Sequence, residues 1–167
     1  MGLFTTPIKT LDDLYLHTLR DIYYAEHQII KVLPTMIEKS NNEALKTALS
    51  THFTETQEQI KRLETVFQLL NTEAKGVTCE AIEGIIAEAK QVMSDVGDPD
   101  VLDAAIASAA QAVEHYEISR YGTLIAMAKR LDRDESVGLL EVTLQEEKHA
   151  DHKLTEVAER EVNKKAA

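Results

Sequence analysis

Four long helical stripes, each interrupted by a single carboxylate, constrain the fold of this chain more than any other feature. Apolar residues recur at the three- and four-residue spacing of a buried helix face, and Glu26, Glu55, Glu117 and Glu147 fall on or beside those faces. A lone carboxylate in an apolar core is strongly unfavourable unless it is protonated, paired or bound to a metal. Four of them, one per helix, predict a helical bundle whose core shares a cation.

The helices must be long, because six glycines and three prolines in 167 residues leave few interruptions. No segment alternates as a strand would, so the fold class is all-α. We expect helices over about 10–39, 43–70, 79–94, 99–131 and 134–162.

Capping sequences support three of these helix starts. The segments Thr10–Asp13 and Asp132–Glu135 have the spacing of capping boxes. Asp98-Pro99 is typical of an N-cap followed by the first helical residue.

The lengths of the connections predict the topology. Short turns near positions 41 and 133 make two antiparallel helical hairpins, whereas the connection from about 70 to 99 is long and carries a helix of its own. One long crossover in a four-helix bundle is the ferritin-like arrangement. We therefore expect residues 1–167 to form a single ferritin-like domain.

The four carboxylates are in matched register along the two hairpins. Glu26 and Glu55 are 29 residues apart across the first turn, and Glu117 and Glu147 are 30 apart across the last. Both glutamates of a hairpin therefore lie at similar distances from its turn. Docking the hairpins would bring the four carboxylates together in the middle of the bundle.

Carboxylate-rich bundle cores bind pairs of ions such as iron or manganese. The usual template has Glu on two helices and Glu-x-x-His on the other two, and this chain departs from it. Glu114 stands one turn before Glu117, Asp151 follows Glu147 by four residues, and Ala150 occupies the position of the template histidine. The result is a ligand set dominated by oxygen.

Other polar residues are candidates to support these ligands. Tyr23 is one turn from Glu26 and Tyr121 is one turn from Glu117, so their hydroxyls could bond the carboxylates. Gln59 and His52 share an apolar stripe, and His52 fits a ligand, a supporting donor or a packed core histidine equally well.

A buried charge network is the alternative to a metal site. In that arrangement the carboxylates would pair with basic side chains from the same helices, namely Arg20, Arg62, Arg120 or Lys148.

Composition narrows the class of partner and the compartment. The net charge of −11 argues against nucleic acid or an anionic membrane as a main partner and is compatible with cations. No apolar run approaches transmembrane length. Cys79 is the only cysteine, so we expect a reducing, cytoplasmic setting and no internal disulfide.

Several runs resemble the YciE/YciF family of bacterial ferritin-like proteins. They are Tyr24–Gln28, Cys79–Gly84, Val113–Ile118, Tyr121–Leu124 and Glu146–Lys148, and the similarity covers nearly the whole chain. The resemblance implies a stress-associated, metal-binding homodimer of ferritin-like fold. It also implies the metal ligands Glu26, Glu55, Glu114, Glu117 and Glu147, with Asp151 as a sixth.

Three functions follow as hypotheses. The first is a di-iron oxidase that uses O2 or H2O2, as a ferroxidase or a peroxide scavenger, with no catalytic residues beyond the metal ligands. The second is a dimanganese, catalase-like enzyme. The third is a stress-induced structural or interaction protein whose metal is not catalytic.

Overall fold

The computed structural model describes residues 7–167, and every regular element in that range is helical. The main helices are α1 (Leu11–Lys39), α2 (Glu43–Leu69), α3 (Glu80–Asp95), α4 (Pro99–Arg130) and α5 (Asp134–Val157). Each begins within one residue of the position expected from the sequence. The last helix is longer than expected, because a π-helical turn (Ala158–Val162) continues it into α6 (Asn163–Ala166).

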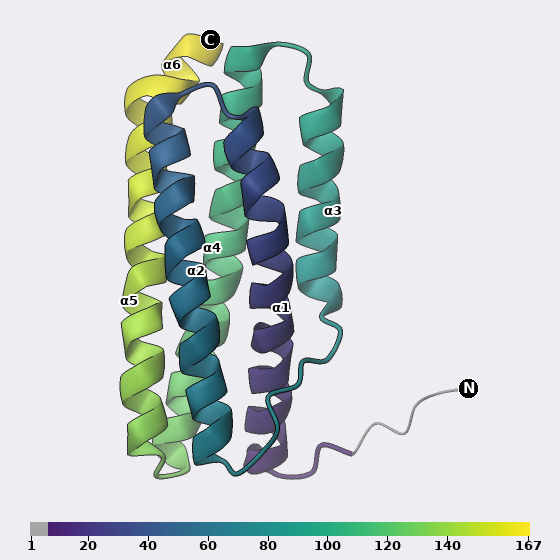
Figure 1. Ribbon diagram of the computed structural model, residues 1–167, viewed down its shortest axis with the longest axis vertical. Helices are drawn as coiled ribbons and strands as arrows, with labels where there is room; N and C mark the ends of the chain where they lie inside the picture. The colour runs from purple at the N-terminus through teal and green to yellow at the C-terminus, as the bar shows by residue number, and fades with distance from the viewer. Residues whose placement is uncertain (1–6) are drawn as a thin grey trace, which may run out of the picture.

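The four longest helices stand side by side in an antiparallel bundle (Figure 1). Around the bundle, α1 packs against α2 and α4, and α5 packs against the same two helices. The connection after α2 climbs the outside of the bundle and carries α3, which packs against α1 and α4. This arrangement confirms the all-α fold with one long crossover.

Side-chain caps fix the starts of α1 and α4 as the sequence indicated. Thr10 Oγ1 accepts from the backbone N of Asp13 at 3.1 Å, and Asp13 Oδ2 accepts from the backbone N of Thr10 at 2.9 Å. Asp98 Oδ1 accepts from the backbone N of the second and third residues of α4. These bonds satisfy amides that have no partner within the helix.

The prediction of a capping box at Asp132 is wrong. Asp132 has a φ of 53° and belongs to the turn that closes α4, where the backbone N of Arg133 donates to Ala128 O at 3.0 Å. Arg133 is the residue before α5, and it makes no side-chain cap. Asp132 stands one residue before the N-cap position of α5, so its side chain is not placed to cap that helix.

Helix α4 is tied to the α1–α2 turn by a buried carboxylate. Asp103, which is 3% exposed, accepts from the backbone N of Asn41 at 2.7 Å and of Asn42 at 2.8 Å. Asn42 in turn caps α2 through the backbone N of Leu45. Asp103 therefore sets the height of the first hairpin relative to α4.

Within residues 7–167, no helix combines the length and the apolar content that crossing a bilayer requires.

Replacing Asp103 with alanine should destabilise the fold by about 2–4 kcal/mol, because two buried amides lose their acceptor. Urea unfolding followed by circular dichroism measures this change. The exposed Asp95 at the end of α3 provides the control, since Asp95→Ala should change stability by no more than about 0.5 kcal/mol. Equal losses for the two variants would contradict the role given to Asp103.

Candidate metal centre

Five ionisable side chains from all four bundle helices converge at mid-height. Glu26 comes from α1, His52 from α2, Glu114 and Glu117 from α4, and Glu147 from α5. None is more than 4% exposed. Each lies in an apolar stripe that faces the bundle axis, so the packing that buries the neighbouring leucines also buries these groups.

Four of the five can contribute atoms to one point. One ligand atom from each of His52, Glu114, Glu117 and Glu147 lies within 4.8 Å of the others. His52 Nδ1 lies 3.5 Å from Glu114 Oε1 and 3.9 Å from Glu147 Oε2, and His52 Nε2 lies 3.7 Å from Glu117 Oε2. These separations exceed hydrogen-bond lengths and suit donors arranged around an ion.

Two neutral hydrogen-bond donors orient the carboxyl groups of Glu26 and Glu147. The Tyr121 hydroxyl donates to Glu26 Oε1, and Gln59 Nε2 donates to Glu147 Oε1. Both donors are fully buried. Each bond uses one oxygen of its carboxylate and leaves Glu26 Oε2 and Glu147 Oε2 without a partner. Such bonds fix a carboxylate in place while a lone pair stays free for a metal.

The buried cluster contains no compensating cation among the described residues. Arg62 pairs with Glu146 instead, with Nη1 at 2.5 Å from Oε2 and Nη2 at 2.6 Å from Oε1. Arg120 lies 3.9 Å from Asp21, Lys148 is exposed, and Arg20 Nε has no hydrogen-bond partner in the described structure. The buried charge network considered from the sequence is therefore not formed.

Polar atoms without hydrogen-bond partners are concentrated at this point of the described structure. Eight of the eleven such side-chain atoms lie here, and they are Glu26 Oε2, both ring nitrogens of His52, Gln59 Oε1, Glu114 Oε2, both carboxyl oxygens of Glu117 and Glu147 Oε2. The other three are Tyr15 Oη, Arg20 Nε and Arg133 Nη1. Buried polar atoms are rarely left unsatisfied, and unsatisfied groups that converge indicate a ligand. The residues thus fit a metal ion by the chemistry of their donors.

Burial sets the protonation of the cluster when no metal is bound. It raises the pKa of Glu26 and of Glu114 to about 8, and it raises the pKa of Glu117 and of Glu147 well above 4.5. Repulsion between the neighbouring carboxyls adds to the rise for Glu26, Glu117 and Glu147. Burial lowers the pKa of His52 to about 4, so its imidazole is neutral and able to ligate.

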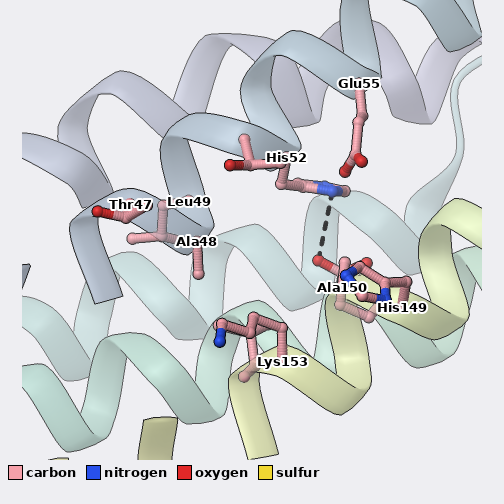
Figure 2. A pocket seen from close by; sticks show the side chains of 11 residues that line it. Thr47, Ala48, Leu49, His52, Glu55, His149, Ala150 and Lys153 are labelled. Atoms are coloured by element: carbon pink, nitrogen blue, oxygen red, sulfur yellow. Dashed lines mark ion pairs between the residues drawn. The ribbon is translucent and has the colours of Figure 1, made fainter. Parts of the chain in front are cut away.

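A pocket of about 140 Å³ reaches the cluster between α2 and α5. Its floor includes the buried His52 and Glu114, whose contact is the dashed line in Figure 2. Its rim includes the half-buried Glu55 and the exposed His149. The cluster is therefore enclosed by the bundle but is approached from one side.

Three residues expected as metal ligands lie outside the four-residue group, namely Glu26, Glu55 and Asp151. Glu26 is buried beside Glu117. Glu55 lines the neighbouring pocket, one turn along α2 from His52. Asp151 is partly exposed, and its Oδ1 contacts His115 Nε2 at 3.0 Å and Gln111 Nε2 at 3.3 Å.

The two tyrosines also differ from the expected pairing. Tyr23 donates to Glu64 at 3.2 Å instead of bonding Glu26. Tyr121 does support the centre, but through Glu26 on α1 and not through Glu117 on its own helix. Spacing along one helix shows which residues share a face, but it does not show which partner a long side chain reaches across the bundle.

Comparisons with known proteins identify relatives of this chain. A family model described as a domain of unknown function, DUF892, matches residues 10–167. Protein YciF of Escherichia coli (strain K12) is 42% identical over 160 residues, which are 95% of this chain and 96% of YciF.

Solved structures agree with that relationship. The crystal structure of the E. coli stress protein YciF matches with a TM-score of 0.89 over 94% of this chain and 99% of that one. YcfI of Rhodopseudomonas palustris, suggested to be a structural protein, is 53% identical and has a TM-score of 0.89 over 92% of this chain and 98% of that one. A protein of Xanthomonas campestris shares the fold at 22% identity, with a TM-score of 0.72 over 90% of this chain and 92% of that one.

The metal-free protein should lose stability as the pH rises from about 4.5 to about 8. The unfolded chain releases the protons of Glu26 and Glu114 near pH 4.5, whereas the folded chain retains them to about pH 8. The stabilising contribution is therefore complete below the unfolded pKa and is lost as the pH passes through the folded pKa.

Urea unfolding in excess chelator across this pH range measures the loss. Glu26→Gln should flatten the profile, and the exposed Glu88→Gln should leave it as in the wild type. Identical profiles for the wild type and Glu26→Gln would contradict this account.

Proposed function

The chain belongs to the DUF892 family, and we propose that it is a stress protein whose buried cluster binds two iron or manganese ions. The proposal rests on one observation above all. Unpaired ligand atoms from the three helices α2, α4 and α5 converge on one buried point beside Glu26 of α1, with no basic side chain to neutralise them. Metal cations would satisfy those atoms and offset the repulsion between the carboxylates.

The donor set favours hard or borderline ions. Glu26, Glu114, Glu117 and Glu147 supply carboxylate oxygens, and His52 supplies one imidazole nitrogen. Oxygen-rich sites of this kind suit iron and manganese better than sites rich in thiolate do. When bound, the ions would supply one-electron chemistry toward O2 or H2O2.

The surrounding residues prepare the ligands. Tyr121 and Gln59 hold Glu26 and Glu147 through single hydrogen bonds, so these carboxylates need little rearrangement to bind an ion. The protons kept by the buried carboxyls must leave as metal enters, which makes binding pH-dependent. The bundle excludes bulk water around the cluster and strengthens every charge interaction within it.

The reaction we propose is oxidation driven by O2 or H2O2, as a ferroxidase for which Fe(II) is the substrate or as a peroxide scavenger. The pocket beside His52 and Glu114 supports this choice, because a redox site needs access for a small molecule. Manganese in the same ligands would give a catalase-like variant of the proposal.

A structural role is the second candidate, favoured by the suggested structural role of the relative YcfI. In that case metal would raise the melting temperature without turnover of Fe(II) or peroxide. Comparing thermal unfolding with oxidation assays on one metal-loaded sample separates the two functions. The homodimer and the cytoplasmic location expected from the sequence stay proposals, and light scattering measures the former.

The metal site can be tested by replacing two central carboxylates. Wild-type protein purified without chelators should contain about two iron or manganese ions per chain, or take them up from Fe(II) or Mn(II). Glu117→Gln/Glu147→Gln should lose at least ten-fold in metal affinity, on the order found for altered metal ligands and their supports. Inductively coupled plasma mass spectrometry measures the content.

A matched control removes the same number of charges elsewhere. Glu88→Gln/Glu159→Gln lies on exposed positions of α3 and of the π-helical turn and should bind metal as the wild type does. Wild-type protein that neither contains nor takes up iron or manganese would sink the proposal.

A further inference from the structure

The pocket between α2 and α5 joins the protein surface to the buried cluster. Its outer wall includes the exposed Thr51, His149 and Lys153, whereas its floor includes the buried His52 and Glu114. Both ring nitrogens of His52 lack hydrogen-bond partners although the side chain is only 4% exposed. A polar group that is buried, unsatisfied and in the pocket wall indicates that the pocket receives a ligand.

Two metal-binding side chains stand at the rim of this pocket. Glu55 on α2 and His149 on α5 make no hydrogen bond or ion pair with the residues that the structure describes. Glu55 is one turn from His52 on the same face of α2, and Figure 2 shows both along one side of the pocket, across from His149. The rim thus offers a carboxylate and an imidazole a short distance above the floor ligands.

We propose that this pocket is the port by which divalent metal ions pass between solvent and the buried cluster, with Glu55 and His149 as transient ligands. The inference rests on the proposed metal site and adds the route to it. An ion would exchange water for the rim ligands, and would then transfer to His52 and Glu114 on the floor.

The charges of the pocket favour a cation over an anion. Carboxyl groups stand at the rim and at the floor, and the chain carries a net charge of −11, which raises the local concentration of cations. The one basic group in the wall, Lys153, lies 3.6 Å from Glu156, which offsets its charge. Ala48 and Ala150 line the wall without offering a ligand atom. An ion would therefore be held at the two ends of the pocket and not between them.

The small side chain of Ala150 keeps the port open. Ala150 is buried and lines the pocket immediately after His149. Leucine at this position would occupy part of the pocket volume of about 140 Å³ and would leave the metal ligands unchanged.

The test measures rates of metal transfer in the full-length protein, with Co(II) as the spectroscopic probe. Stopped-flow absorbance follows Co(II) uptake by metal-free protein and Co(II) release to excess EDTA. Glu55→Gln/His149→Gln removes the rim ligands and keeps the size of the carboxylate side chain, and Ala150→Leu narrows the pocket. Glu58→Gln/His152→Gln is the control, because it alters the same residue types on the same helices at exposed positions outside the pocket.

Both port variants should slow uptake and release about ten-fold while the bound Co(II) at equilibrium stays at the wild-type level. The control should match the wild type in all three measurements. Wild-type rates in Glu55→Gln/His149→Gln, with normal Co(II) content, would overturn the port and leave the metal site standing. Loss of Co(II) at equilibrium in that variant would overturn the transient role, because the rim residues would then be permanent ligands.

A wild type that binds no Co(II), iron or manganese would remove the proposed function and the port together. Should Ala150→Leu unfold, as circular dichroism would show, the rim variant decides the matter alone, since its positions are at most half-buried.

Discussion

The mutual repulsion of buried carboxylates is the constraint around which this bundle is organised. Packing of the apolar side chains removes four carboxyl groups from water, and the carboxyl groups do not stabilise that packing. They are Glu26, Glu114, Glu117 and Glu147. Their charge can be offset only by protons or by bound cations, because the described core holds no basic side chain beside them. Packing of the apolar stripes stabilises the fold, and part of that stabilisation offsets the free-energy cost of burying the carboxyl groups.

Arg62 is placed so that its guanidinium group does not neutralise the buried carboxyls. Glu146 and Glu147 are adjacent on α5, so their side chains differ by about 100° in direction around the helix. Arg62 pairs with Glu146, whose Oε2 also accepts from Gln59 Nε2 at 3.2 Å, and Arg62 donates to Thr143 at 3.1 Å. The pair binds α2 to α5 beside the centre and keeps the cation out of it. If Arg62 reached Glu147, an internal salt bridge would replace the position open to a metal.

Helical periodicity predicted much of this structure. It gives the direction of a side chain around the helix only coarsely, and this limit explains part of what it could not predict. Glu26, Glu117 and Glu147 lie within unbroken apolar stripes, and the structure buries all three. Glu55 lies near the edge of its stripe, where a small rotation of α2 decides between core and pocket, and His52 reaches the centre from the preceding turn. Asp103 gave no signal, because its partners are backbone amides of a turn about 60 residues away in sequence. Contacts of this kind depend on how the hairpins dock, which no local pattern contains.

The crossover makes the two sides of the bundle unequal. Helix α3 covers the seam between α1 and α4, and the segment before it is held by a bond from Val77 N to Arg20 O at 3.3 Å. At Gly76 the chain runs so close to Tyr24 that an added Cβ would lie 2.9 Å from the tyrosine Cβ. The seam between α2 and α5 has no such cover in the described structure, and the pocket opens there. The long connection therefore does more than reverse the direction of the chain. By covering one seam, the crossover leaves the pocket on the opposite side of the bundle, so the topology itself makes the two faces of the molecule different.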